Sequence, residues 1–338
     1  MTPTMAALVG GAGPDWEVRH VDVPTAGPGQ LLVRVRAAGL NRADLSMLAG
    51  TYNAGATRRD TFTAGLELAG EVKAIGPGVD KIGVGDRVMG TTLGAFASLA
   101  LVDHRHVVAV PGPLGWTDAA ALPIGLTTEH DALVTQGRFT TGQRVLVVGA
   151  TSGVGMIAVQ LAKALGAALV VATTTSDAKA QALTAVGADV VVNTTSEDLA
   201  EVVNRATGGA GVDIVLDHVG GDLFAELFAA TRIRGIIVNI GRLAGPRSTI
   251  NLDQLSFRRL RVQGTTFSIR TAEERGEVAA ALVPVVLPAV ADGRIRPVVD
   301  SVFPFEEAQR AADRMRSNQA VGKIVIEMPS TDAYEEDR

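Results

Sequence analysis

Short apolar runs alternate with helical segments between residues 144 and 267, and this alternation restricts the chain to a small set of folds. The runs are rich in Val and Ile, and most are separated by helical segments of about ten residues. Strands joined in this way form βαβ units, which build a parallel sheet. We therefore predict an α/β fold with a doubly wound sheet of the Rossmann type. The predicted strands are residues 144–148, 168–172, 189–192, 213–217, 235–240 and 261–267, and the predicted helices are 154–165, 178–186, 198–207 and 222–231.

The first third of the chain follows a different pattern. Its apolar segments are short and partly alternating, and turns such as Gly76-Pro77-Gly78 separate them, which indicates an antiparallel β region. Residues 298–327 return to a strand–helix–strand pattern, and a six-stranded doubly wound sheet leaves no partner for these two strands. The sequence therefore predicts that both ends of the chain form one domain, into which the domain with the parallel sheet is inserted. The predicted divisions are 1–122 with 295–329, 123–294, and a flexible tail at 330–338.

The sharpest local motif is the glycine turn GATSGVG at residues 149–155, which follows a strand and opens a helix. A dinucleotide site requires this context, because Gly153 lets the backbone approach a pyrophosphate and Gly155 lets the helix pack on the strand. The free N–H groups of the helix start then face the anion. Ser152 stands where a middle glycine is often found, so a tight turn of an unrelated α/β fold remains an alternative. Spacing excludes a P-loop, because Val154 occupies the place of its glycine–lysine pair.

The end of the next strand indicates which nucleotide binds. It reads Thr173-Thr174-Thr175-Ser176 and has no carboxylate before Asp177. An NAD site usually has an Asp or Glu about 20 residues after the glycine turn, bonded to the ribose 2′-hydroxyl. Hydroxyl groups together with Lys179 suit a 2′-phosphate instead, by donor geometry and charge. We predict NADPH as the cofactor, with the alternative that Lys179 is only a solvated helix residue.

Composition excludes several other classes. The chain has no cysteine, which removes disulfides, thiol nucleophiles and every zinc site built on thiolate. Its 31 basic and 36 acidic residues give a net charge of −5, which argues against nucleic-acid or anionic-membrane binding. The longest apolar run, residues 279–291, contains two prolines and is shorter than the roughly 20 residues of a spanning helix. We expect a cytoplasmic protein with no nucleic-acid or membrane partner and, since the pair His104 and His106 lacks a third ligand, no metal.

Several segments together resemble the medium-chain dehydrogenase/reductase superfamily, in its zinc-free quinone oxidoreductase branch. They are NRADL (41–45), GLELAGEV (65–72), VGDRV (84–88), VLVVGATSGVGMIAVQLAKALGA (145–167), TGGAGVDIVLDHVGG (207–221) and VGKIVI (321–326). The resemblance covers about residues 5–327 and implies a GroES-like β-rich catalytic domain beside the Rossmann domain. Zinc-dependent relatives often carry a ligand histidine where this chain has Leu66, so the resemblance also implies a metal-free enzyme. It further implies a homodimer.

The resemblance implies catalytic roles for Tyr52, which matches a family tyrosine near the nicotinamide and substrate, and for Asn41, at the floor of the cleft. Structural alternatives stay open for both: Tyr52 as a loop anchor and Asn41 as a turn residue. Asp44 is read as structural, because an Asp after a turn readily bonds backbone N–H groups. His130 stands where relatives often carry an aromatic residue. The predicted cofactor-binding residues are Thr127, Ser152, Gly153, Val154, Gly155, Thr174, Ser176, Lys179, Asn193, Thr194, Gly241, Arg242, Thr266, Phe267, Ser268 and Lys323.

The predicted reaction follows from catalytic residues that the chain lacks. Oxidising an alcohol requires a group that takes the hydroxyl proton, and neither Tyr52 nor Tyr334 has a lysine four residues on. Hydride addition to a quinone, enone or alkenal requires only hydrogen-bond donors for the developing oxyanion, with a proton from water. We therefore predict an NADPH-dependent reductase of such small-molecule electrophiles. The alternatives are an enoyl-thioester reductase, for which the cluster Arg258, Arg259 and Arg261 would form a basic rim, and a catalytically weak NADPH-binding structural or regulatory protein.

Overall fold

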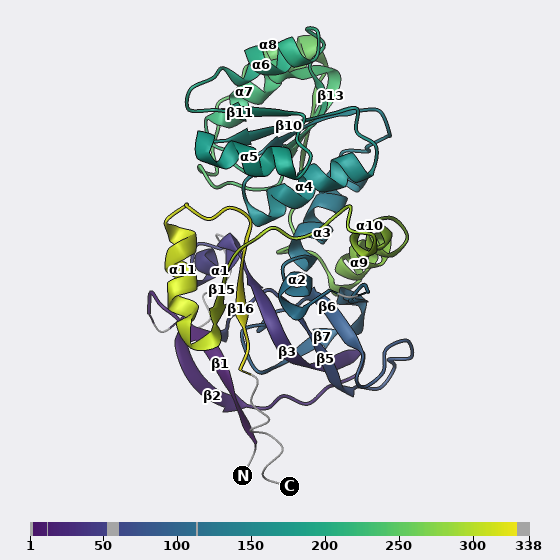
Figure 1. Ribbon diagram of the computed structural model, residues 1–338, viewed down its shortest axis with the longest axis vertical. Coiled ribbons are helices and arrows are strands. Elements are labelled where there is room, and N and C mark those ends of the chain that lie inside the picture. The colour runs from purple at the N-terminus through teal and green to yellow at the C-terminus, as the bar shows by residue number, and fades with distance from the viewer. Residues whose placement is uncertain (1–2, 12, 53–60, 113, 330–338) are drawn as a thin grey trace. The chain divides into compact units, whose positions relative to one another are not determined.

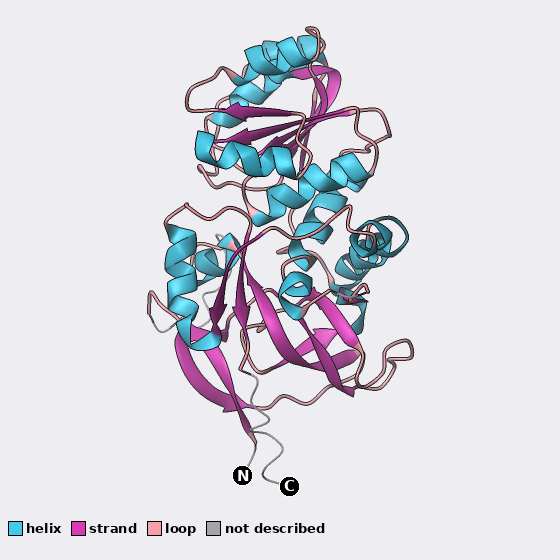
Figure 2. Ribbon diagram, viewed as in Figure 1, coloured by secondary structure: helices cyan, strands magenta, loops and turns pink. Residues whose placement is uncertain are grey.

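The structure, a computed structural model, describes residues 3–11, 13–52, 61–112 and 114–329 (Figure 1). It divides into two compact units. Unit 1 contains Met1–Ile124, Thr271–Val283 and Val299–Arg338, and unit 2 contains Gly125–Arg270 and Pro284–Val298. Figure 2 shows that strands dominate unit 1, whereas strands and helices alternate in unit 2.

Unit 2 contains the predicted Rossmann sheet. Its six strands are all parallel and lie in the order β11-β10-β9-β12-β13-β14, the order of a dinucleotide-binding fold. The strands are β9 (Arg144–Val148), β10 (Leu169–Thr174), β11 (Val190–Asn193), β12 (Val212–Asp217), β13 (Thr231–Asn239) and β14 (Arg261–Gly264). The helices are α4 (Gly153–Ala164), α5 (Asp177–Ala185), α6 (Leu199–Ala206), α7 (Leu223–Ala230), α8 (Leu252–Arg258) and α10 (Leu287–Ala291), with α3 (Pro123–His130) and the π-helix η2 (Asp131–Gln136) at the start of the unit.

The last strand of this sheet is shorter than predicted. The apolar pattern suggested a strand over 261–267, but β14 ends at Gly264. The chain turns away there because the Thr265 hydroxyl donates to Asp131 Oδ2 at 2.7 Å. A side-chain bond to a residue this distant in sequence is invisible to local patterning.

Unit 1 is built on a seven-stranded sheet in the order β15-β16-β3-β5-β6-β8, with β7 also paired to β3. The C-terminal strand β16 runs antiparallel to β3, pairing Ile324 with Leu40, so the two ends of the chain share one sheet as predicted. The strands are β3 (Gln30–Leu40), β5 (Glu67–Ile75), β6 (Arg87–Thr91), β7 (Leu99–Asp103), β8 (Val107–Ala109), β15 (Val299–Pro304) and β16 (Lys323–Glu327). A second sheet holds β1 (Thr4–Gly10), β2 (Glu17–Asp22) and β4 (Phe62–Thr63), and the helices are α1 (Arg42–Leu48), α2 (Trp116–Ala120), α9 (Ala272–Val285) and α11 (Ala308–Arg316), with 3-10 turns η1 (His104–His106) and η3 (Phe305–Glu307).

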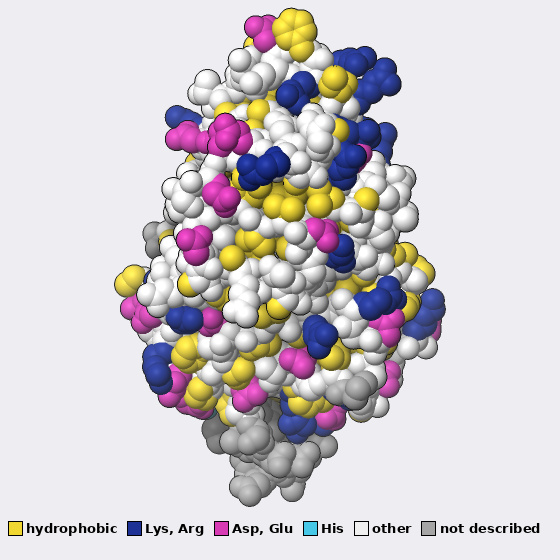
Figure 3. All heavy atoms as spheres, turned by 45° about the horizontal axis from the view of Figure 1, so that its top comes forward, with side chains coloured by type: hydrophobic (Ala, Val, Ile, Leu, Met, Phe, Trp, Pro, Cys, Tyr) yellow, Lys and Arg dark blue, Asp and Glu magenta, His cyan; other side chains and the backbone are white. Residues whose placement is uncertain are grey.

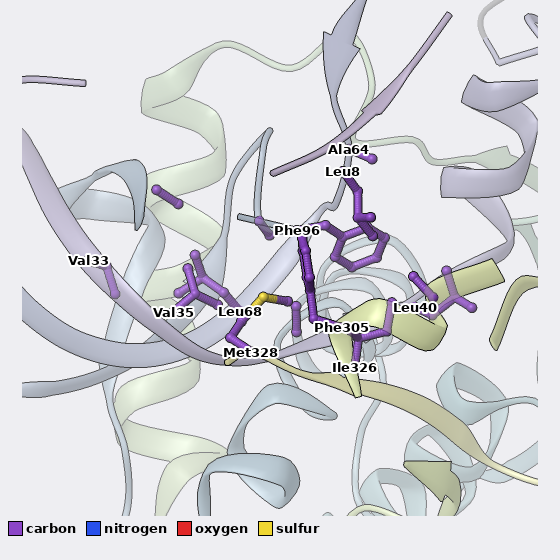
Figure 4. Packing of buried hydrophobic residues seen from close by; sticks show 14 of the residues in the cluster. Leu8, Val33, Val35, Leu40, Ala64, Leu68, Phe96, Phe305, Ile326 and Met328 are labelled. Carbon is purple, nitrogen blue, oxygen red and sulfur yellow. The ribbon is translucent and has the colours of Figure 1, made fainter. Parts of the chain in front are cut away.

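The core of unit 1 joins residues from both ends of the chain (Figure 4). Phe96 is fully buried and meets Trp16 edge to face, with ring centroids 5.5 Å apart. Phe305 and Ile326 from the C-terminal segment pack into the same cluster. Burial of several large side chains, each contributing about 1.5–3 kcal/mol, holds the C-terminal segment in this unit.

Helix α9 begins with a capping box: the Thr271 backbone N–H donates to Glu274 Oε2 at 2.7 Å, and the Glu274 N–H donates to Thr271 Oγ1 at 3.2 Å. The sequence-based division assigned this segment to the nucleotide domain, but residues 271–283 group with unit 1. The physical reason is its packing on η1, where Gly276 lies against the Arg105 side chain. Pro284 lies inside the helix, and the chain continues as α10.

Candidate active site

The glycine turn between β9 and α4 has the form that a pyrophosphate requires. Ser152 is the N-cap of α4, and its Oγ accepts the Gly155 backbone N–H at 3.0 Å and donates to the Gly149 carbonyl at 3.0 Å. The serine that departs from the glycine motif therefore closes the turn with its hydroxyl. A side chain at Gly155 would place Cβ 2.7 Å from Ala150 Cα, so only glycine permits this approach. The turn thus matches a cradle of backbone N–H groups at a helix N-terminus.

The residues predicted to select the 2′-phosphate lie together at the carboxyl ends of the neighbouring strands β10 and β11. Thr174 Oγ1 accepts the Ser176 N–H at 3.1 Å, and the Thr194 N–H donates to the Thr174 carbonyl at 3.0 Å. Asn193 Nδ2 donates to Asp177 Oδ1 at 2.7 Å, which engages the first carboxylate after the strand. Lys179 lies in the first turns of α5 and is half-buried. Hydroxyl groups, the ammonium of Lys179 and the carboxylates of Asp177 and Glu197, both bonded to Asn193, therefore lie at this end of the sheet.

The loop after β13 carries the predicted cofactor-binding residues Gly241 and Arg242, and the loop after β12 lies beside it. Asp217 Oδ1 accepts the N–H groups of Val219 and Gly220 at 2.9 and 3.0 Å, and Oδ2 accepts Asn239 Nδ2 at 2.8 Å. A Cβ at Gly241 would clash with the His218 carbonyl oxygen, which explains the glycine that precedes Arg242. The structure thus brings the loops after β12 and β13 into direct contact.

The loop after β14 is anchored by a charge that the sequence reading missed. Asp131 is buried, and its Oδ2 accepts Thr265 Oγ1 at 2.7 Å and Arg270 Nη2 at 2.6 Å. The Arg270 guanidinium also lies 4.4 Å from the ring centroid of Phe267, and Thr266 Oγ1 lies 3.0 Å from Ser268 Oγ. These contacts fix the three residues 266–268, which were predicted to bind the cofactor. No local signal marks Asp131 as buried, because it follows Glu129 and His130 in a segment of mixed polar and apolar residues.

Two further predicted residues lie on α3 in the same unit. Thr127 and His130 are both buried, and burial lowers the pKa of His130, an effect that the neighbouring Asp131 charge opposes. The neutral imidazole is therefore the form expected at pH 7. This burial favours the interpretation of His130 as a packed helix residue.

Unit 1 contains a buried charged cluster of Asn41, Glu67 and Lys323, with Asp44 beside it. Lys323 Nζ donates to Asn41 Oδ1 at 2.6 Å and forms an ion pair with Glu67 Oε1. Asn41 Nδ2 donates to Glu67 Oε1 at 2.8 Å and to the Gly39 carbonyl at 3.2 Å. Glu67 Oε2 accepts the Ile124 N–H at 2.8 Å. A buried carboxylate and a buried ammonium thus neutralise each other through short contacts.

Asp44 closes the N-terminus of α1, where its Oδ2 accepts the Asn41 backbone N–H at 2.8 Å. Burial is the largest cause that raises the pKa of Asp44, to about 7, and the Glu67 charge adds to it; the Asn41 N–H and the Lys323 charge oppose it. The structural interpretation of Asp44 agrees with this cap.

These residues do not fit a zinc ion. The chain offers no thiolate, Leu66 flanks the cluster, and the carboxylate of Glu67 is already paired with an ammonium. Among the described residues, no three His, Asp or Glu side chains are grouped as a metal site would require.

Tyr52 and Lys323, the remaining predicted residues, both belong to unit 1. Tyr52 follows α1, its backbone N–H donates to the Ser46 carbonyl at 3.1 Å, and its side chain is half-buried. Lys323 points into the cluster with Asn41 and Glu67, whereas the other predicted cofactor-binding residues lie in unit 2. Its role toward the cofactor therefore stays a prediction.

Comparisons with known proteins agree with this geometry. Residues 153–282 match the family described as zinc-binding dehydrogenase, and residues 27–112 match the alcohol dehydrogenase GroES-like domain. The chain is 29% identical over 304 residues to quinone oxidoreductase-like protein 2 of Bos taurus, covering 89% of this chain and 86% of that protein. It is 32% identical over 327 residues to 2-haloacrylate reductase of a Burkholderia species, covering 93% and 96% of the two chains.

Other similar proteins are much longer. The chain is 34% identical over 306 residues to erythronolide synthase EryA2 of Saccharopolyspora erythraea, and the match covers 89% of this chain but only 8% of that protein.

Among solved structures, a mycobacterial quinone oxidoreductase matches with a TM-score of 0.82 and 30% identity over 96% of this chain and 99% of that one. A mycobacterial structure complexed with NADPH matches with the same TM-score and identity, over 96% and 100% of the two chains. No described helix combines the length and the apolar character needed to cross a bilayer.

Proposed function

The chain belongs to the medium-chain dehydrogenase/reductase superfamily, in its quinone oxidoreductase branch, and from this membership we propose that it is an NADPH-dependent, metal-free reductase of quinones or of the activated C=C bonds of enones and alkenals. One observation carries the choice of acceptor: the buried carboxylate of Glu67, whose oxygens could otherwise bind a cation, is already ion-paired with Lys323. Without a metal to stabilise an alkoxide, the acceptor must be one whose reduced oxyanion needs only hydrogen bonds.

The residues of unit 2 fit a nicotinamide dinucleotide. The turn at Ser152 and Gly155 would hold the pyrophosphate, and Thr174, Ser176 and Lys179 would hold the 2′-phosphate. Bound NADPH would supply the hydride. The loops anchored by Asp131 and Asp217 would keep the nicotinamide in one orientation, because their backbones are fixed by buried carboxylates.

In unit 1 we assign the donor for the substrate oxygen to Tyr52. Asn41 was the other candidate, but both hydrogens of its amide are donated, to Glu67 and to the Gly39 carbonyl. Its amide oxygen accepts Lys323. Asn41 therefore positions the charged cluster, while the phenol of Tyr52 donates a hydrogen bond that strengthens as charge develops on the acceptor, and water supplies the proton.

The test is NADPH oxidation by the purified protein with p-benzoquinone, a 2-alkenal and a cyclic enone, followed by the loss of absorbance of the nicotinamide. Turnover of at least one acceptor is expected. NADPH binding without turnover of any of them would refute the reductase and favour the structural or regulatory alternative.

The cofactor preference has its own test in Lys179→Ala. The wild-type protein should bind NADPH more tightly than NADH, and the variant should narrow this difference roughly tenfold, as expected for loss of one charge-assisted contact to phosphate. Lys163→Ala is the matched control, because that lysine is paired with Asp189. Equal affinities of the wild type for the two dinucleotides would refute the choice of NADPH.

An enoyl thioester is a second candidate acceptor, favoured by the similarity to erythronolide synthase EryA2. Arg259 and Arg261, from the basic cluster named for this alternative, are exposed, while Arg258 donates to the Thr231 carbonyl at 2.8 Å. Adding crotonyl-CoA to the acceptor panel tests it. Reduction of the thioester alone would select this alternative over the quinone and enone.

We also propose that the protein is a homodimer. Strand β14 is the edge of its sheet and is exposed along its length, and an unpaired edge is a template for pairing with another strand. The neighbouring side chains of Ile233, Phe257 and Val262 are 53%, 80% and 46% exposed. Figure 3 shows such apolar side chains beside Lys and Arg on the face it draws. Light scattering after gel filtration should give twice the mass of the chain, and the mass of one chain would refute the dimer.

A further inference from the structure

We propose that the ion pair between Glu129 and His218 is a positioning element of the dinucleotide site, which fastens the glycine turn to the loop after β12. The inference rests on the proposed binding of a nicotinamide dinucleotide by unit 2. It assigns a function to two charged residues that the sequence reading did not use.

The geometry fits a doubly protonated ring beside an ionised carboxylate. His218 Nδ1 lies 2.8 Å from the Val148 carbonyl oxygen, and Nε2 lies 2.8 Å from Glu129 Oε1. A backbone carbonyl and an ionised carboxylate only accept hydrogen bonds, and a neutral imidazole has only one N–H to donate. The side chains of His218 and Glu129 are 7% and 0% exposed, so water does not replace either contact. Both contacts are therefore satisfied only by the imidazolium.

The pair joins three segments that the cofactor site needs. Val148 is the last residue of β9, directly before the glycine turn. A Cβ on Gly149 would lie 3.5 Å from His218 Cβ and 3.0 Å from Val219 Cγ2, so the start of the turn packs on the loop after β12. Glu129 lies on α3, two residues after the predicted cofactor residue Thr127. The imidazolium thus holds the end of β9, the loop after β12 and α3 in one arrangement.

The surrounding charges favour the imidazolium. Burial, the largest single cause, lowers the pKa of His218, but the charge and hydrogen bond of Glu129, the Val148 carbonyl and the charge of Asp217 together raise it above its ordinary value. Glu129 comes from α3, Asp217 from β12 itself and the carbonyl from β9. Glu129 Oε2 has no hydrogen-bond partner among the described residues. The carboxylate therefore depends on the imidazolium, and loss of either charge leaves the other buried and unpaired.

Two substitutions at one position separate positioning from charge. Glu129→Leu removes the contact and leaves the ring unheld at Nε2. In Glu129→Gln the amide NH2 can donate to Nε2 of a neutral ring, while Nδ1–H still donates to Val148. We expect Glu129→Leu to weaken NADPH binding about tenfold at pH 7 and Glu129→Gln to stay within about threefold of the wild type.

The dependence of NADPH affinity on pH separates this positioning role from a role in packing alone, which would not change with pH. Over pH 7–9.5 the 2′-phosphate of NADPH is fully ionised, since such phosphates have a second pKa of about 6. The affinity of the wild-type protein for NADPH should fall as His218 loses its proton, because the Val148 carbonyl or the Glu129 carboxylate then faces the lone pair of an unprotonated ring nitrogen. The Glu129→Gln variant should show no such fall, because its amide supplies the missing donor.

The experiment measures the Kd of NADPH and NADH by fluorescence titration across this pH range, with circular dichroism to confirm folding. Glu226→Leu is the control, since Glu226 is exposed on α7. A folded Glu129→Leu variant with wild-type affinity, or a Glu129→Gln variant with the wild-type pH profile, would overturn the inference. If Glu129→Leu does not fold, the profiles of the wild type and Glu129→Gln decide. A wild-type protein that binds neither dinucleotide refutes the proposed function instead.

Discussion

The substitution Glu67→Gln tests the buried cluster of unit 1 most directly. The carboxylate of Glu67 has three partners: the Lys323 ammonium, Asn41 Nδ2 at 2.8 Å and the Ile124 N–H at 2.8 Å. Glutamine has one acceptor oxygen and no charge. Whichever way its amide is oriented, the Lys323 ammonium loses its ion-pair partner, and one donor faces the amide NH2 instead of an oxygen.

The magnitude follows from these losses. Removing one partner of a buried ion pair costs about 3–5 kcal/mol, because an uncompensated charge remains. A buried N–H left without an acceptor adds about 1–3 kcal/mol. We expect Glu67→Gln to lower the free energy of unfolding of unit 1 by at least about 3–5 kcal/mol, a large part of the 5–15 kcal/mol typical of a domain. Lys323→Met should cost a similar amount, since it leaves the carboxylate unpaired. The double variant should lose less than the sum.

Urea unfolding followed by tryptophan fluorescence is a suitable assay, because both tryptophans, Trp16 and Trp116, belong to unit 1. Trp16 is buried against Phe96, so its emission reports the core of this unit. Glu306→Gln, at an exposed position of the same unit, is the matched control. A Glu67→Gln variant within about 1 kcal/mol of the wild type, or additive effects in the double variant, would show that the pair is not the coupled unit inferred above.

Three other substitutions have defined outcomes. The folded pKa of Asp44, about 7, lies above the ordinary 3.8, so the folded protein holds an extra proton between these values and Asp44 makes the free energy of unfolding fall as pH rises from about 4 to about 7. In Asp44→Asn the slope of the unfolding free energy against pH should therefore be less negative than in the wild type over this range. Identical slopes in the two proteins would contradict the assignment. Gly155→Ala would place Cβ 2.7 Å from Ala150 Cα, so we expect NADPH binding to weaken at least about tenfold in a calorimetric titration, whereas an unchanged Kd would mean that the turn does not hold the pyrophosphate. Tyr52→Phe should lower kcat about 100-fold, as for other single oxyanion donors, and leave the Kd of NADPH unchanged; an unchanged kcat would leave Tyr52 a packing role.

The parts of this structure that the sequence predicted well depend on local patterns. The predicted strand at 144–148 coincides with β9, and the predicted strand–helix–strand pattern at 298–327 ends in β16, since apolar runs and turn residues act over a few neighbours. The glycine turn could likewise be recognised in the sequence, because it is closed by residues three apart. These motifs were sufficient for the fold class, and they predict a dinucleotide site at the glycine turn.

The parts that the sequence did not predict depend on distant partners. Asn41 and Lys323 are 282 residues apart, and Glu129 and His218 are 89 apart. Each residue alone is an ordinary surface type, and only the folded chain shows that both members of each pair are buried. The early end of β14 has the same origin, because it follows from the bond of Thr265 to Asp131. The sequence therefore predicts a site but not the buried charged pairs beside it.

The cluster of Glu67 and Lys323 also explains how the interrupted unit 1 can assemble in one register. The last strand of unit 1, β16, follows the whole of unit 2 in the sequence. The apolar residues of β16 alone would tolerate a displaced pairing with β3, but a slip of one residue turns every side chain to the opposite face. Such a slip would move the Lys323 ammonium away from Glu67 and Asn41 and leave a buried carboxylate unpaired, at a cost of several kcal/mol. A buried ion pair adds little net stability compared with apolar residues, yet it makes the wrong register far worse than the right one. The ion pair of Glu67 and Lys323 thereby also fixes the strand that completes the sheet of unit 1.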